Sequence, residues 1–223
     1  MSQLLIVSST VFEIEDFIKD HCSSVSKFHY KVTNKADIHV LITGMGIANM
    51  TLQLSRFLNE HQISGAINTG FCGSFSTKFP PGSIVQTDSD CFAELGTLNE
   101  DQTIRTFSDN TPANEITGQL NMFVKPDALL RSVYSNSPMV RGITVSSCTN
   151  NSQRAAFFKL QFEAETETME GAAFYLCCNA YRIPCVQLRA VSNFIPSGGK
   201  VGWDVPRAQL AIRNLLEKVI RNQ

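Results

Sequence analysis

The chain has 223 residues, 43% of them hydrophobic, so it can bury a substantial core, and we expect one domain spanning residues 1–223. Nineteen basic residues nearly balance 20 acidic ones, and this lack of a basic excess argues against a nucleic-acid-binding protein. The sequence has no apolar run of the ~18–20 residues that a transmembrane helix needs, and its first residues do not have the pattern of a signal peptide. A cytoplasmic protein with no membrane partner is expected.

The cysteine and histidine content predicts neither disulfides nor a metal centre. The seven cysteines are an odd number without a C-x-x-C pair, which is typical of reduced thiols. The four histidines, His21, His29, His39 and His61, show no familiar metal-ligand spacing. We therefore expect no metal and no cofactor.

Predicted strands and helices alternate along the chain. In order they are a strand at 4–7 with a helix after residues 8–10, a strand at 38–42 with a helix at 47–58, strands at 66–70 and 83–88, a polar surface segment at 99–121, helices at 152–160 and 167–181, a strand at 185–191 and a final helix from Asp204. This order favours an α/β fold with a mixed central β-sheet flanked by helices.

Ligands of such sheets bind at the carboxyl ends of the strands, so we expect functional residues in the turns at 8–13, 43–46, 69–74 and 192–194. The turn at Gly44–Gly46 is either a tight strand-to-helix turn or a phosphate cradle. Glu170 is either an acid favoured by a helix N-terminus or an acceptor for sugar hydroxyls. Asn193 is either a turn former or a polar group that points into a ligand crevice.

Five segments, in order, resemble the purine nucleoside phosphorylase and nucleosidase superfamily over essentially the whole chain: TGMG at 43–46, INTGFCGS at 67–74, GSIVQTD at 82–88, TMEGAA at 168–173 and RAVSN at 189–193. Within that superfamily the chain is most similar to the futalosine hydrolases, through AELG at 93–96, ETMEGAAFY at 167–175 and the tail at 202–215. The resemblance implies a nucleoside phosphorylase-like fold.

The resemblance also implies roles for individual residues. Glu13, rather than its neighbour Glu15, matches the carboxylate that orients and deprotonates water. Glu170 matches the carboxylate that binds ribose hydroxyls, Met169 the residue that packs under the sugar, and Asn193 the group that contacts the base. The other substrate-binding positions implied are Gly46, Phe71, Cys72, Gly73 and Thr149.

The amide at Asn193 is informative about the leaving base. Adenine-specific relatives have an Asp at this position, whereas an Asn cannot act as a general acid near neutral pH but can donate to N7 or to a 6-oxo group. Asn193 therefore favours hypoxanthine or guanine. Futalosine carries hypoxanthine, in agreement with the resemblance.

The positions of the arginines favour water over phosphate as the nucleophile. Phosphorylases of the superfamily neutralise phosphate with arginines near the N-terminus and before the G-x-C-G turn. Here the first arginine is Arg56, inside a predicted helix, and Asn68 precedes the turn. Phe71 also stands where relatives often have Ser.

A site for futalosine is expected to contain an aromatic wall and a cation that bind the benzoate at its 5′ end. Candidates on this side are Phe92, Leu95, Lys200 and Arg207, and Trp203 is either a stacking residue or an anchor for the last helix. In relatives a neighbouring subunit closes this pocket, so we expect a homo-oligomer. Phe107, Phe123 and Tyr134 are the candidates for that contribution.

The predicted function is hydrolysis of futalosine to hypoxanthine and dehypoxanthine futalosine in menaquinone biosynthesis, with a small-molecule nucleoside as the partner. Three alternatives stay open: a 6-oxopurine nucleoside phosphorylase, a methylthioadenosine/adenosylhomocysteine-type nucleosidase, and a nucleoside-binding sensor without catalysis. Glu13 argues against the sensor, because a pure binder does not need a carboxylate that activates water.

Overall fold

The structure is a computed structural model that describes residues 3–101, 103–106, 123–124, 137–196 and 202–222. Its helices are η1 (Phe12–Ile14), α1 (Glu15–His21), α2 (Ile47–Glu60), α4 (Ser152–Phe162), α5 (Gly171–Ala180) and α6 (Val205–Arg221). Its strands are β1 (Leu4–Ser8), β2 (Cys22–Ser26), β3 (His29–Val32), β4 (Lys35–Ile42), β5 (Gly65–Ser74), β6 (Ile84–Cys91), β7 (Gly96–Leu98), β8 (Ile104–Thr106), β9 (Phe123–Val124), β10 (Met139–Thr144), β11 (Thr166–Thr168) and β12 (Cys185–Phe194).

A mixed 10-stranded sheet forms the centre of the molecule, in the order β11-β10-β6-β12-β5-β1-β4-β3-β2, with β9 attached to β6. Strands β4, β1, β5 and β12 are parallel neighbours, whereas β12 pairs with β6 in the antiparallel sense. An additional pairing of β11 with β5 closes β5, β12, β6, β10 and β11 into a ring. The predicted mixed α/β fold is confirmed.

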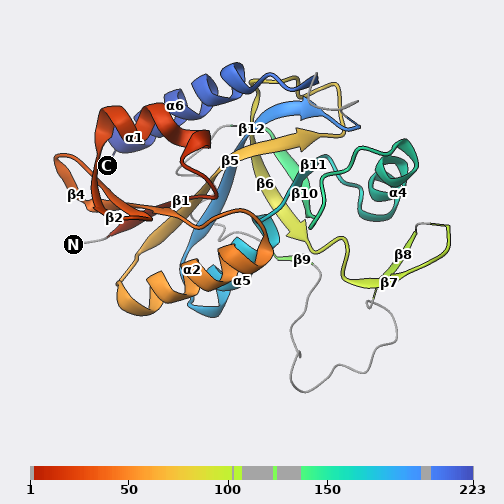
Figure 1. Ribbon diagram of the computed structural model, residues 1–223, viewed down its shortest axis with the longest axis horizontal. Coiled ribbons are helices and arrows are strands. Elements are labelled where there is room, and N and C mark those ends of the chain that lie inside the picture. The colour runs from red at the N-terminus through yellow and green to blue at the C-terminus, as the bar shows by residue number, and fades with distance from the viewer. Residues whose placement is uncertain (1–2, 102, 107–122, 125–136, 197–201, 223) are drawn as a thin grey trace.

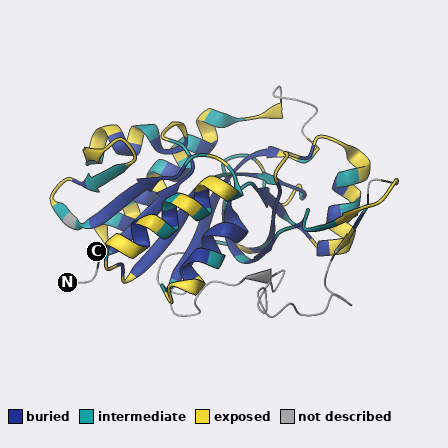
Figure 2. Cartoon of the chain, turned by 60° about the horizontal axis from the view of Figure 1, so that its bottom comes forward, coloured by how far each residue is buried: buried dark blue, intermediate teal, exposed yellow. Residues whose placement is uncertain are grey.

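Helices cover both faces of the sheet (Figure 1). On one face α1 and α6 pack on it through residues such as Phe17 and Leu216, and on the other α2 and α5 pack through residues such as Met50 and Phe174. Figure 2 shows the strands as the buried layer and α2 with an exposed outer stripe. None of the described helices is both long enough and apolar enough to cross a bilayer.

The expected turn at 69–74 is wrong, because β5 continues as a strand to Ser74. The glycines in this segment allow close approach rather than a turn. Gly70 has φ +142°, and a Cβ on it would lie 2.6 Å from Oε1 of Glu13. The strand therefore continues past a glycine at the point where a carboxylate contacts its backbone. Residues 192–194 likewise belong to β12 and not to a turn.

The helix expected at 167–181 begins only at Gly171, because residues 166–168 pair as β11 with β10 and β5. The sequence pattern also missed the hairpin of β2 and β3, whose residues are mostly polar or exposed. The polar surface segment expected at 99–121 contains a strand, β8, which pairs with β7 just before it. Residues 107–121 of this segment lie outside the described part. The last helix starts as predicted, with Oδ1 of Asp204 accepting a hydrogen bond from the backbone N–H of Arg207 at 3.2 Å.

Candidate active site

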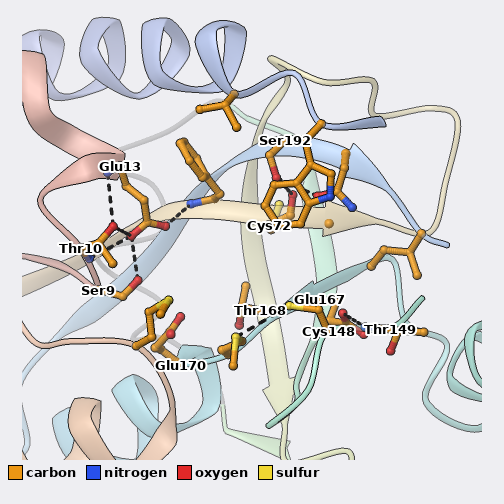
Figure 3. Close-up of a pocket in the computed structure, with 18 of the residues that line it drawn as sticks. Ser9, Thr10, Glu13, Cys72, Cys148, Thr149, Glu167, Thr168, Glu170 and Ser192 are labelled. Carbon is orange, nitrogen blue, oxygen red and sulfur yellow. Dashed lines mark hydrogen bonds between the residues drawn. The ribbon is translucent and has the colours of Figure 1, made fainter. Parts of the chain in front are cut away.

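A cavity of about 560 Å³ opens at the carboxyl ends of β1, β5 and β12, where ligands of α/β sheets bind (Figure 3). Four groups of residues line it. They come from the β1–α1 connection (Ser9, Thr10, Phe12, Glu13), from the ends of β5 and β12 (Phe71, Cys72, Gly73, Ser192, Asn193, Ile195), from the segment after β10 and from β11 (Cys148, Thr149, Asn150, Glu167, Thr168, Met169, Glu170), and from the starts of α2 and α6 (Met45, Trp203, Val205).

Glu13 is a buried carboxylate held by five hydrogen bonds. Its Oε2 accepts from the Ser9 hydroxyl at 2.8 Å, from both the backbone N–H and the hydroxyl of Thr10 at 3.1 Å, and from the Ser8 hydroxyl at 3.3 Å. Its Oε1 accepts from the backbone N–H of Phe71 at 2.8 Å. These hydrogen bonds fix the orientation of the carboxylate. Oε1, with a single partner among these five donors, has the capacity to accept from a bound water.

Glu170 is the N-cap of α5, but its side chain does not cap that helix. Instead its Oε1 accepts a 2.8 Å hydrogen bond from the backbone N–H of Gly46, at the start of α2. Burial raises the pKa of Glu170, and the charge of Arg189 and this hydrogen bond partly offset that effect. The Gly44–Gly46 turn therefore positions a carboxylate, and the N–H of Gly46 is not available to a phosphate.

Arg189 is a buried guanidinium beneath the cavity, on β12. It is 1% exposed and donates from Nε to the Gln187 side chain at 3.1 Å. A Cβ on Gly70 would lie 2.8 Å from Nη1 of Arg189 and 2.6 Å from Oε1 of Glu13, so both side chains meet at this glycine. Gln187 in turn donates to the buried Asp90 at 3.0 Å. This chain of side chains supplies a positive charge below the carboxylates of the cavity.

Asn193 presents its amide to the cavity from β12. Its Oδ1 accepts from the Ser192 hydroxyl at 2.8 Å, and its Nδ2 donates to the backbone carbonyl of Phe194 at 3.0 Å. An amide NH₂ carries two protons, so one remains to donate to a ligand. The Ser192 hydroxyl also lies 3.2 Å from the carbonyl of Cys72, which ties the amide to the end of β5.

Glu167 is a third buried carboxylate in the cavity, and it was not among the residues predicted from the sequence. Its Oε1 accepts from the backbone N–H of Thr149 at 2.8 Å, whereas its Oε2 has no hydrogen-bond partner among the described residues. The hydroxyl of Thr149 is also buried without a partner there. Burial raises the pKa of Glu167, and the contacts with Thr149 act against that rise. A signal was present in the sequence, since Glu167 alternates with threonines in a short buried strand.

The structure brings most of the predicted site residues together. Glu13, Met169, Glu170, Asn193, Phe71, Cys72, Gly73 and Thr149 all line the cavity, and Gly46 contacts it through Glu170. Met169 accepts a 3.8 Å contact from the thiol of Cys148. Burial raises the pKa of Cys72 to about 12, so it is a neutral thiol, and all seven cysteines are free.

The residues proposed for the 5′ side are not all at the cavity. Trp203 lines it, but Phe92 and Leu95 do not, because Phe92 packs against the core under α2 and α5. Arg207 also lies away from the cavity, because its side chain packs across Gly82 and pairs with Asp204. Lys200, Phe107 and Tyr134 lie outside the described residues, as does the side chain of Phe123.

Comparison with curated proteins finds nucleosidases of two kinds. A futalosine hydrolase of Streptomyces coelicolor is 24% identical over 188 residues, which are 81% of this chain and 77% of the relative. A 5′-methylthioadenosine/S-adenosylhomocysteine nucleosidase of a Geobacillus species is 21% identical over 211 residues, which are 91% of this chain and 85% of the relative.

The fold is similar to that of solved nucleosidases. The native futalosine hydrolase of Helicobacter pylori superposes with a TM-score of 0.81 at 13% identity, covering 100% of this chain and 98% of the other. A mutant of the Helicobacter pylori MTAN with 5′-methylthioadenosine in its active site gives 0.79 at 12% identity, with 100% of both chains covered. A family model described as the phosphorylase superfamily matches residues 3–221, and this chain therefore belongs to that superfamily.

Proposed function

We propose that this protein is a purine nucleosidase that hydrolyses the N-ribosidic bond of futalosine and releases hypoxanthine. The observation that carries the proposal is the convergence of Glu13, Glu170 and Asn193 on one cavity. Cleavage of this bond passes through a state with oxocarbenium character, which needs a positioned nucleophile, contacts to the sugar and stabilisation of the departing base. Glu13 would orient and deprotonate the water, Glu170 would bind the ribose hydroxyls, and Asn193 would donate to the base.

The charge of the cavity supports water as the nucleophile. Among the described residues that line it, three are carboxylates and none is a lysine or arginine. A phosphate dianion would meet these carboxylates, and the Arg189 guanidinium lies beneath the lining, bonded to Gln187 and to the carbonyl of Thr69. The N–H of Gly46, which could have served such an anion, is occupied by Glu170.

Glu167 and Asn193 together support a 6-oxopurine as the base. The free Nδ2 proton of Asn193 can donate to N7 or O6, and the unpartnered Oε2 of Glu167 can accept the N1–H that a 6-oxopurine carries and an adenine lacks. An unpaired buried acceptor is costly until a ligand fills it. This pairing favours futalosine over methylthioadenosine.

The 5′ end would lie along the exposed side of the cavity. Phe12, Met45 and Trp203 line the cavity while staying 55%, 63% and 38% exposed, which gives an apolar wall suited to a benzoate ring.

We also propose that a second copy of the chain covers this side. Met45, in the turn before α2, and Leu52, on α2, are exposed apolar side chains of the kind found at interfaces. Light scattering would give the oligomeric state.

The test is release of free base by the purified protein from futalosine, inosine and 5′-methylthioadenosine, each with and without phosphate. The proposal expects hypoxanthine from futalosine at a rate that phosphate does not change. Phosphate-dependent cleavage of inosine would make the protein a phosphorylase, and preferred cleavage of methylthioadenosine would overturn the assignment of the base. Tight binding without any release would indicate a sensor.

A further inference from the structure

Three of the four histidines meet at the end of α2 that is remote from the cavity. His29 lies on β3, His39 on β4, and His61 follows the last residue of α2. One ligand nitrogen from each ring lies within 4.8 Å of the others, and Nε2 of His29 is 2.9 Å from Nδ1 of His39. We propose that these three imidazoles bind a divalent transition-metal ion of the zinc class.

The fold creates this ligand set, since the histidine spacing in the sequence predicts none. In the antiparallel pairing of β3 and β4, His29 lies opposite Leu41 and Lys31 opposite His39. His29 and His39 are therefore diagonal neighbours on one face of the sheet. The end of α2 brings the ring of His61 to 5.5 Å from that of His29 and 5.6 Å from that of His39.

The ring of His61 is oriented as in protein metal sites. Its Nδ1 lies 3.0 Å from the backbone carbonyl of Phe57. A carbonyl only accepts, so Nδ1 carries the proton and Nε2 has a free lone pair. A backbone carbonyl that fixes one nitrogen of an imidazole is the usual way in which metal-binding histidines are oriented.

His39 faces Nε2 of His29 with its Nδ1, which is therefore its ligand atom in this arrangement, and its other nitrogen is buried. His39 is only 2% exposed, and its Nε2 has no hydrogen-bond partner among the described residues.

The chemistry of the donors selects the class of ion. Imidazole suits Zn²⁺, Ni²⁺ and Cu²⁺, whereas Ca²⁺ and Mg²⁺ need oxygen donors. In a tetrahedral zinc site the nitrogens are about 3.3 Å apart, given Zn–N bonds of about 2.0–2.1 Å. The pair of His29 and His39 is close to that spacing, and the end of α2 would move closer to bring the His61 nitrogen, now within 4.8 Å of theirs, to the same distance. His29 and His61 are half-buried, so the fourth position opens to water.

The ion would have a structural role. Helix α2 has 14 residues, about 21 Å at the usual rise, and its first turn contacts the cavity while the histidines lie at its last. A bound ion would tie the β3–β4 hairpin to the end of α2. The proposal therefore does not depend on the proposed function, and chelation would leave base release unchanged.

The experiment is titration of the chelator-treated full-length protein with Zn²⁺ alone, followed by calorimetry, and with Co²⁺ alone, followed by its visible absorption. We expect one ion per chain, and at an ion concentration 100 times the Kd the ratio of folded to unfolded protein should rise about 100-fold. His61→Gln should weaken binding at least 10-fold. His21→Gln is the matched control, because His21 lies apart, beside Glu217 at 3.5 Å.

A second measurement does not depend on the folding of a variant. In the wild-type protein, Zn²⁺ should shift the imidazole ¹⁵N resonances of His29, His39 and His61 and leave those of His21 unchanged. No binding by the wild type, or equal affinity in the His61→Gln and wild-type proteins, would overturn the proposal. The cluster would then be a set of rings in aromatic packing, in keeping with the stacking of Phe57 on His61 at 4.0 Å.

Discussion

The backbone N–H of Gly46 donates a 2.8 Å hydrogen bond to Oε1 of Glu170, which lies 124 residues later in the chain. This contact joins the start of α2 to the start of α5 across the mouth of the cavity. It turns the carboxylate away from α5, which begins at the next residue, and toward the space where we place a ribose. A glycine turn that resembles an anion site thus positions an anionic side chain of the protein itself.

Replacement of Glu13 by Gln should lower kcat by about 10²–10⁴-fold, the usual contribution of a general base, and leave nucleoside binding largely intact. Glu15→Gln is the matched control, because Glu15 pairs with Lys19 at 2.7 Å on the exposed side of α1. Steady-state kinetics and a melting temperature for each variant separate catalysis from folding. Equal activity of Glu13→Gln and the wild type would refute the proposed role.

Replacement of Glu170 by Gln keeps an acceptor for Gly46 but removes the negative charge that would strengthen hydrogen bonds to the ribose. We expect kcat/KM for inosine or futalosine to fall by about 10–100-fold, as for loss of one charged hydrogen bond of about 1.5–3 kcal/mol. The loss should be smaller for the corresponding 2′-deoxynucleoside, if Glu170 contacts that hydroxyl. An equal loss for both sugars would argue for a purely structural role of the carboxylate.

Replacement of Asn193 by Ala should lower the rate by about 10²-fold or more, through loss of a donor to the departing base. Asn193→Asp should instead raise the ratio of kcat/KM for methylthioadenosine to that for futalosine, because a protonated carboxyl group can donate to N7 while its other oxygen accepts from a 6-amino group. Asn179→Ala, on the exposed end of α5, is the control. An unchanged ratio in Asn193→Asp would remove this residue from base recognition.

Replacement of Glu167 by Gln should lower kcat/KM for 6-oxopurine nucleosides by about 10–100-fold, because the buried acceptor for N1–H becomes a neutral amide. Activity on a nucleoside without that proton, such as 1-methylinosine, should be low in the wild type and little affected by the substitution. Glu165→Gln controls for a loss of charge nearby, since Glu165 bonds the backbone N–H of Arg141 and does not line the cavity.

Replacement of Asp90 by Asn should change how stability depends on pH. Burial raises the pKa of Asp90 from 3.8 to about 6, so between these values the folded protein holds a proton that the unfolded chain has released. The stabilisation from this group is therefore complete below pH ~4 and is lost as the pH rises through ~6, on the order of 2–3 kcal/mol in total.

Asp90→Asn has no carboxyl group at this position, so its stability lacks this contribution to the pH dependence. Urea unfolding at pH 4.5 and pH 7.5 should show that the wild type loses stability relative to Asp90→Asn at the higher pH. A difference between the two proteins that stays constant with pH would contradict the shifted pKa. The Asn side chain would also alter the hydrogen bond that Asp90 accepts from Gln187, which shifts the free energy of unfolding at every pH. The informative quantity is therefore the change in the stability difference between pH 4.5 and pH 7.5.

The sequence predicted the elements whose apolar residues follow a clear period. Strand β1, helix α2 and helix α6, with its Asp204 cap, appear where the pattern placed them. The hairpin of β2 and β3 was missed because its residues carry little apolar alternation and gain stability from pairing with β4. The start of α5 was placed too early because β11 is held by pairing with two strands distant in sequence.

Residues of the candidate site could be predicted from the sequence where they follow a predicted strand or belong to a recognisable motif. Glu13, Glu170 and Asn193 were identified in this way, and the structure places all three at the cavity. Two features could not be predicted from the amino-acid sequence alone. The free oxygen of Glu167 depends on which way a side chain faces in a closed ring of strands, and the three-histidine cluster depends on a hairpin that the pattern did not contain.

The pairing of Glu167 with Gly73, where β11 meets β5, has a consequence for synthesis of the chain. Glu13, proposed to activate water, leaves the ribosome early, whereas Glu170, proposed for the ribose, and Glu167 and Asn193, proposed for the base, leave it late. A product that stops between Glu13 and β11 keeps the carboxylate proposed to activate water but lacks Glu167 and Asn193, the residues proposed to bind the base. Premature stop codons should therefore give inactive protein throughout the first 165 positions, with no partly active truncation.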